Sequence, residues 1–165
     1  MTKLSNSELF TQMFITASQV VIKNHSFEKF DLTRLQALTL ANICRMPGIS
    51  MGKLANLIGV SRSQITGIVE TLVQISLVRR EKSPKNRLFY NIYSTEKGDQ
   101  FFEKQCRVLD DYFEERLQKL NEDELEQLKA DLEDSFCLMD KSNMLPQGFI
   151  NPFTYQFPSK NQQIE

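Results

Sequence analysis

The sequence predicts a mainly α fold with one small β-hairpin, and three observations lead to this fold class. Apolar residues recur at steps of three and four over most of residues 6–140, which is the period of amphipathic helices. Within this stretch the period becomes two between residues 77 and 93, in two apolar runs that flank a polar segment containing Pro84 and Asn86. With 41% hydrophobic and 25% charged residues, the 165-residue chain has the composition of one soluble globular domain.

Helix start and stop signals divide the first part of the chain. The first helix is expected over residues 6–24. Thr33 and Gln36 form a capping-box pattern ahead of a second helix, which Pro47 and Gly48 end. The apolar stripe of this second helix is expected to consist of Leu35, Leu38, Leu40 and Ile43.

Two shorter helices and a hairpin come next. Ser50 is expected to cap a helix that Gly59 ends, and Ser61 is expected to cap the following helix. The buried face of that following helix is predicted to be Ile65, Ile68, Val69 and Leu72. Two helices joined by a short turn and followed by a hairpin have the order of a winged helix-turn-helix.

Long helices are predicted at both ends of this lobe. Thr95 caps the first helix after the hairpin, Gly98 allows its first turn to pack closely against a neighbour, and Asn121 begins a further helix. The apolar stripes on these helices and on residues 6–24 exceed what one small lobe can cover. They are therefore expected to mediate dimerisation, through Phe10, Phe14, Val21, Phe102, Leu109 and Phe113.

Charge is divided along the chain, although the net charge is only −1. Between residues 53 and 87, seven basic residues stand against two acidic ones, a net of +5. Between residues 96 and 140, fifteen acidic residues stand against six basic ones, a net of −9. Charge runs can be plain solvated faces, but together with the helix order this division favours double-stranded DNA as a partner for the middle of the chain.

The start of the fourth helix carries the candidate base-reading side chains, because a major groove about 12 Å wide admits a helix and the first turns reach base edges. Arg62 could fork onto guanine and Gln64 onto adenine, or both could hold phosphate. Gly67 would permit a close approach to DNA or to a neighbouring helix, and helix packing is the preferred interpretation. The DNA-binding candidates here are Ser61, Arg62, Ser63, Gln64 and Thr66.

The hairpin carries a second group of candidates. Lys82, Lys85 and Arg87 are expected to reach the DNA backbone or the minor groove, since a narrow groove concentrates negative potential. Arg80 is expected instead to anchor the hairpin to the body of the lobe.

These pieces, in this order, resemble the MarR family of bacterial transcription regulators. The resemblance covers about residues 6–140 and rests on LTRLQ at 32–36, LA at 54–55, IGVS at 58–61, ITGIVETL at 65–72, LVRR at 77–80, Arg87 and STEKG at 94–98. In one respect the chain departs from the family, whose wing usually has an acidic residue two positions before its arginine. Here that position is Lys85, so the usual acid–arginine pair is replaced by additional positive charge.

The resemblance implies a domain organisation and a function. Residues 1–140 would form a single domain, with a DNA-binding winged-helix lobe at 32–95 and dimerisation helices at 6–24 and 96–140. The protein would be a homodimeric, sequence-specific transcriptional regulator, a repressor of a pseudo-palindromic operator that a small organic effector releases. The alternative is a winged-helix adaptor that binds another protein, whose binding would depend less on salt than DNA binding does.

Other features of the sequence bound this interpretation. One histidine, three distant cysteines and the absence of a recognisable catalytic motif predict no enzyme, no metal and no cofactor, and the missing signal peptide and membrane span predict a cytoplasmic protein. Cys44 lies beside Arg45, which could lower its pKa and make it a redox sensor, but a small apolar role in the core is preferred. Residues 141–165 are expected to be an extended or disordered tail, with 145–157 as a segment that could dock on the dimerisation helices.

Overall fold

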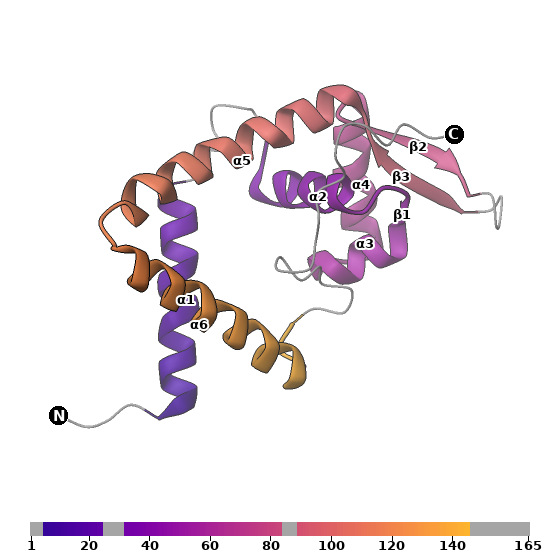
Figure 1. Ribbon diagram of the computed structural model, residues 1–165. Coiled ribbons are helices and arrows are strands. Elements are labelled where there is room, and N and C mark those ends of the chain that lie inside the picture. The colour runs from indigo at the N-terminus through magenta and orange to yellow at the C-terminus, as the bar shows by residue number, and fades with distance from the viewer. Residues whose placement is uncertain (1–4, 25–31, 84–88, 146–165) are drawn as a thin grey trace.

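The computed structural model describes residues 5–24, 32–83 and 89–145, with only the backbone for 21–24 (Figure 1). Lys85, Arg87, the side chain of Val21 and the predicted tail from residue 146 onward lie outside the described residues. The elements are α1 Asn6–Asn24, α2 Arg34–Arg45, β1 Ile49–Ser50, α3 Met51–Ile58, α4 Arg62–Gln74, β2 Val78–Lys82, β3 Tyr90–Ser94, α5 Glu96–Leu117 and α6 Glu122–Lys141. The predicted fold class, mainly α with a small β-hairpin wing, is confirmed.

Capping side chains begin the helices where the sequence predicts. Thr33 Oγ1 accepts from the Gln36 backbone N–H at 3.3 Å, while Gln36 Oε1 accepts from the Thr33 N–H at 2.7 Å, which completes a capping box. Ser50 caps α3, and Gly59 ends it with φ 75°, a left-handed conformation that favours glycine. Ser61, Thr95 and Asn121 cap α4, α5 and α6 as expected.

The sheet contains a third strand that the sequence analysis did not predict. Its order is β1-β3-β2, and both pairings are antiparallel, with Ile92 of β3 opposite Ile49 on one side and Arg80 on the other. The Gly48 N–H donates to the Ile92 carbonyl at 2.9 Å and extends the β1 pairing. A two-residue strand is too short to show a period of two, so only its partner reveals it.

The core lies between α2, α3, α4 and the sheet. Its most deeply buried side chains are Leu40, Ile43, Leu54, Ile65, Val69, Leu72, Val78 and Ile92. The prediction that Leu35 and Leu38 belong to this face of α2 is wrong, because they are 42% and 49% exposed. Thr39 takes their place in the core, where its hydroxyl donates to the Leu35 carbonyl at 2.6 Å and so needs no partner outside its own helix.

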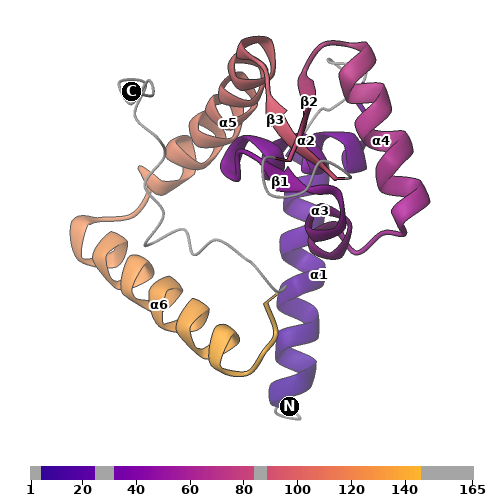
Figure 2. The ribbon, with the colours of Figure 1, turned by 90° about the vertical axis from the view of Figure 1, so that its right-hand side faces the viewer.

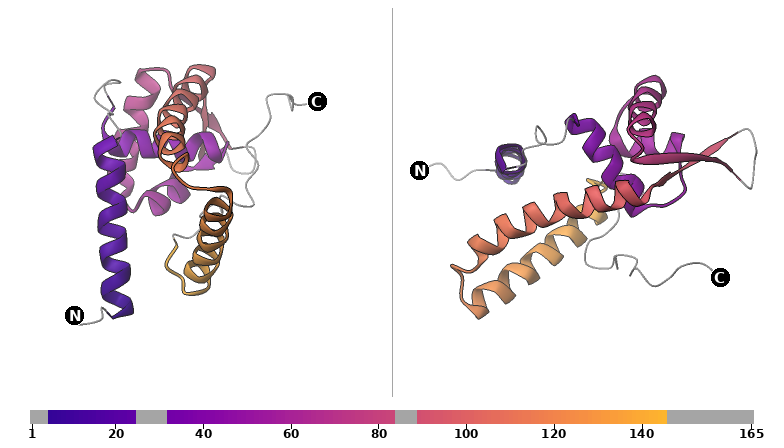
Figure 3. Two further views of the ribbon diagram at one scale, coloured as in Figure 1. Left: turned by 60° about the vertical axis from the view of Figure 1, so that its left-hand side comes forward. Right: turned by 90° about the horizontal axis from the view of Figure 1, so that it is seen from above.

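The terminal helices extend away from this lobe (Figures 1 and 2). The long helix α5 runs away from the sheet, and α6 turns back below α5 in the view of Figure 1. In Figure 1, α1 overlaps α6, but the view from above in Figure 3 shows α1 end-on and apart from both α5 and α6. Within the described part of the chain, no helix is long and apolar enough to cross a membrane.

Candidate nucleic-acid interface

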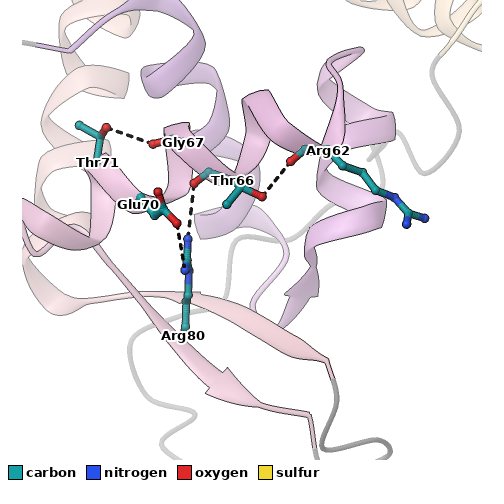
Figure 4. Close-up of polar contacts among 6 residues, drawn as sticks. All are labelled: Arg62, Thr66, Gly67, Glu70, Thr71 and Arg80. Carbon is teal, nitrogen blue, oxygen red and sulfur yellow. Dashed lines mark hydrogen bonds and ion pairs between the residues drawn. The ribbon is translucent and has the colours of Figure 1, made fainter.

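The N-terminus of α4 is presented to solvent with one long cationic side chain free. Ser61 and Gln64 close a capping box, which satisfies the backbone N–H groups of these two residues within the chain. Arg62 follows at the first helical position and is exposed, and among the described residues its guanidinium has no partner. Figure 4 shows it extended away from the helix. A free guanidinium with five donors suits a guanine edge or a phosphate.

Gln64 is less free than the sequence suggests. Its side-chain oxygen accepts from the Ser61 N–H at 3.1 Å and from the Ser61 hydroxyl at 3.0 Å. A bidentate contact with adenine needs both the oxygen and the amide nitrogen of a glutamine. While the capping box is intact, Gln64 therefore offers only its amide donors. Ser63 and Thr66 are also committed locally, to the Ser61 hydroxyl at 3.0 Å and the Arg62 carbonyl at 2.8 Å.

Arg80 joins the hairpin to α4, as the sequence analysis predicts. Its guanidinium donates to the Thr66 carbonyl at 3.5 Å and lies 3.9 Å from the Glu70 carboxylate (Figure 4). Glu70 projects from the middle of α4, with a side chain that is 55% exposed. The two contacts hold β2 against the recognition helix and occupy the guanidinium of Arg80, which agrees with its expected role as an anchor.

The other described cations of the hairpin differ in whether a partner holds them. Arg79 is held by Glu81 at 2.8 Å and lies over the ring of Tyr93 at 5.1 Å from its centroid. Lys82 is exposed opposite Tyr90 in the antiparallel register, and no described residue pairs with its ammonium group. Phe89, which the sequence analysis did not single out, is 62% exposed beside it. Lys82 is thus the free cation on the described part of the wing.

A shallow, open hollow lies between the start of α2 and the exposed side of α4. We call it the Gly67 hollow, and its lining residues are Leu35, Gln36, Ser63, Gln64, Gly67, Ile68 and Thr71. The misassigned Leu35 forms part of its apolar wall. No sequence signal pointed to this hollow, because its two walls come together only in the folded lobe.

The preferred interpretation of Gly67 as a packing residue is wrong. Gly67 is exposed, and a Cβ added there would meet no atom within 4 Å. Gly98 is the opposite case, because an added Cβ would overlap the Leu77 carbonyl oxygen, which confirms the close packing predicted for the first turn of α5.

The predicted dimerisation residues lie on the terminal helices. Phe10 and Phe14 are 37% and 48% exposed, with ring centroids 6.5 Å apart, and Phe113 is 41% exposed. Phe102 and Leu109 are half-buried, and the Arg45 guanidinium lies 5.7 Å from the centroid of the Phe102 ring. Arg45 therefore shields part of Phe102 within the chain.

Cys44 has the properties of a core residue. It is partly buried against the hydrophobic core, and burial, followed by the nearby Asp99 carboxylate, raises its pKa to about 12. Arg45 does not lower this pKa, contrary to the redox alternative. Burial also raises the pKa of Cys106, against a smaller opposing effect of Arg45. Reaction with oxidants requires the thiolate, so both sites are poorly suited to redox sensing.

A capped recognition helix with a free arginine, a preceding helix joined by a tight turn and a hairpin anchored beside it define a winged-helix DNA-binding fold. Residues 32–87 match the family model described as "MarR family". The chain belongs to the MarR family of transcriptional regulators.

Individual relatives agree with this assignment. The solved transcriptional regulator SlyA is 30% identical, with a TM-score of 0.59 over 81% of this chain and 92% of that one. An uncharacterised HTH-type transcriptional regulator of Bacillus subtilis (strain 168), YybA, is 32% identical over 81 residues, which are 49% of this chain and 54% of that protein. The match therefore spans about half the length of this relative. MepR of S. aureus bound to ethidium bromide shares the fold, at 22% identity and a TM-score of 0.57 over 82% of this chain and 97% of that one.

Proposed function

We propose that this chain is a repressor that binds a pseudo-palindromic operator as a homodimer, with α4 in the major groove and the β2–β3 hairpin against the flanking DNA. The observation that carries the proposal is the state of Arg62. Its side chain is extended and unpaired among the described residues, at the first turn of a helix whose own caps are complete. A cation in that position is available to a guanine edge or phosphate without breaking any contact of the fold.

The charges around α4 support a duplex as the ligand. Of the described basic residues on the wing, Arg79 and Arg80 are paired with Glu81 and Glu70, while Lys82 remains available. Lys82 and Arg62 thus provide free positive charge on the hairpin and on the helix. Two such points, on neighbouring elements, suit a helix in one groove and a wing on the adjacent backbone.

Homodimerisation is supported by α1. Every described side chain from Asn6 to Gln19 is exposed, including those of Phe10 and Phe14, and α1 lies apart from α5 and α6. Most of the stability of a helix in a protein comes from packing of its apolar face, and exposed phenylalanines add a further cost. A second copy of the chain would cover α1 and the exposed apolar side chains of α5 and α6, among them Phe113, Leu128 and Leu132.

The mode of regulation follows from the size of such a dimer. Two recognition helices about one DNA turn, roughly 34 Å, apart would occupy both half-sites on one face of the duplex. A promoter covered in this way is closed to polymerase, and we therefore propose repression.

A small organic effector is the further partner that we propose. MepR, which shares the fold, is bound to ethidium bromide in a solved structure. A ligand that binds only the folded dimer would raise its thermal stability with concentration. A panel of small aromatic compounds, tested by thermal shift and then by release of the DNA, would show whether this chain has such a site.

The decisive experiment selects preferred duplexes from random sequences with the full-length protein. We expect an inverted repeat, and Arg62→Ala should lose about tenfold or more in preference for it, because a bidentate base contact contributes roughly 1–3 kcal/mol. Arg107→Ala is the matched control, since Arg107 lies on α5 with a side chain that is 74% exposed. No enriched sequence, or binding that does not weaken as salt rises, would instead favour a protein-binding adaptor.

A second experiment addresses the dimer. Phe14→Glu places a charge among the exposed apolar side chains of α1 and should shift the protein to monomer in analytical ultracentrifugation at micromolar concentration. Gln12→Glu adds the same charge about half a helical turn away and should leave the dimer intact. A parent protein that sediments as a monomer would contradict the proposed assembly.

A further inference from the structure

Gly67 stands at the centre of the exposed side of α4. Residues three and four positions apart are neighbours on a helix surface, so Gly67 is surrounded by Ser63, Gln64, Glu70 and Thr71. Glycine destabilises a helix interior relative to alanine, and a Cβ here would meet no atom within 4 Å. Neither the backbone conformation nor the packing of the described residues requires a glycine at this position.

The exposed surface of the hollow around Gly67 is mostly apolar, although Gln36, Ser63 and Gln64 also line it. The side chains of Leu35 and Ile68 line the hollow, and Leu35 is 42% exposed. The hydroxyl of Thr71 donates to the Gly67 carbonyl at 3.1 Å (Figure 4). The polar group of this side chain is therefore engaged within the helix. The oxygens of Ser63 and Gln64 are engaged with Ser61.

The major groove presents hydrogen-bonding groups at every base pair but only one apolar group, the C5-methyl of thymine. Removal of a side chain at position 67 leaves room for that methyl group, and the apolar wall of Leu35, Ile68 and Thr71 would bury it.

We propose that the Gly67 hollow takes the C5-methyl group of a thymine in the operator, so that α4 reads one A·T pair of each half-site by apolar contact. The inference rests on the proposed function and adds to it a base and a position on the helix. Gly67 serves as the floor of the contact, and its lack of a Cβ sets how closely α4 approaches the base edge.

The test replaces each thymine of the selected operator, one symmetric pair at a time, with deoxyuridine, which lacks only the C5-methyl group. For the parent protein, one pair of positions should lose about fourfold in affinity per half-site, the effect of one buried methyl-sized group. Gly67→Leu fills the hollow and should bind the thymine and uracil duplexes equally. Gln74→Leu places a leucine at the far end of α4 instead and should keep the discrimination.

A second variant separates a role in binding from a role in folding. Gly67→Ala should raise the melting temperature and lower operator affinity, whereas a purely structural glycine would lower both when replaced. A parent that prefers the selected operator but tolerates uracil at every position would overturn the inference and leave the proposed function standing. If no duplex is selected at all, the proposed function fails and the inference fails with it.

Discussion

Substitution of Gly98 by alanine tests the junction between the DNA-binding lobe and α5. Gly98 is buried in the first turn of α5, and an added Cβ would lie 3.0 Å from the Leu77 carbonyl carbon and would overlap its oxygen. The same oxygen accepts from the Thr95 N–H at 3.0 Å, so α5 cannot move away without stretching that bond. The clash is with backbone, which cannot rotate aside as a flexible side chain would.

The expected magnitude is a balance of three effects. Overpacking costs about 1–3 kcal/mol, and the weakened Thr95–Leu77 hydrogen bond costs about 1 kcal/mol. The higher helix propensity of alanine returns about 1 kcal/mol. The net loss in the free energy of unfolding is therefore about 2 kcal/mol, or roughly 4–8 °C in melting temperature for a chain of this size.

Urea denaturation at a fixed protein concentration measures this loss. Gly52→Ala is the matched control, because Gly52 lies in α3 and a Cβ there would meet no atom within 4 Å. It should be neutral or slightly stabilising. If Gly98→Ala is as stable as Gly52→Ala, the close contact between α5 and Leu77 does not exist.

Three further outcomes follow from the free charge of the wing and from the partly buried thiol of Cys44. Lys82→Ala should weaken binding to every duplex by a similar factor and lower the slope of log affinity against log salt by about one unit. Arg79→Ala should change this slope less, because the guanidinium of Arg79 is held by Glu81. Equal slopes for the parent and both variants would remove Lys82 from the interface. In the folded protein at pH 8, Cys44 should be alkylated far more slowly than the exposed Cys137, and its rate should keep rising toward pH 12, because its pKa is raised to about 12. Since this pKa lies above that of an unfolded thiol, its contribution to stability should be present below about pH 9 and lost as the pH rises from there to 12. Rapid alkylation of Cys44 at pH 8, detected by mass spectrometry, would refute its buried position.

The parts of the fold that could be predicted are those specified by neighbouring residues. Thr33, Ser61 and Thr95 each fix a helix start through a hydrogen bond three residues away, and the structure forms all three. The anchoring role of Arg80 was also predictable, since it lies at a hairpin position whose alternation points it toward the helices. Local chemistry was sufficient in each case.

The parts that could not be predicted depend on which surfaces meet. Leu35 is exposed and Thr39 is buried because the position of the core around α2 is decided by α4 and the sheet. The strand at 49–50 exists only through its pairing with β3. In the sequence, a glycine such as Gly67 has the same appearance whether its backbone faces another part of the protein or a ligand. Only the residues around it in the folded structure distinguish the two cases.

The contact of α5 with the lobe gives the molecule a lever. The helix has 22 residues and is therefore about 33 Å long, and it is fixed at its N-terminal end by the fit of Gly98 against Leu77. Because Arg80 connects the wing to α4, the recognition helix and the hairpin are expected to move as one body when α5 tilts. A tilt of about 5° over that length displaces the far end by about 3 Å, as much as a whole hydrogen-bond distance. A shift of about 3 Å among the terminal helices would thus turn the DNA-binding lobe by about 5°, and the spacing of the two recognition helices would be set far from the DNA that they read.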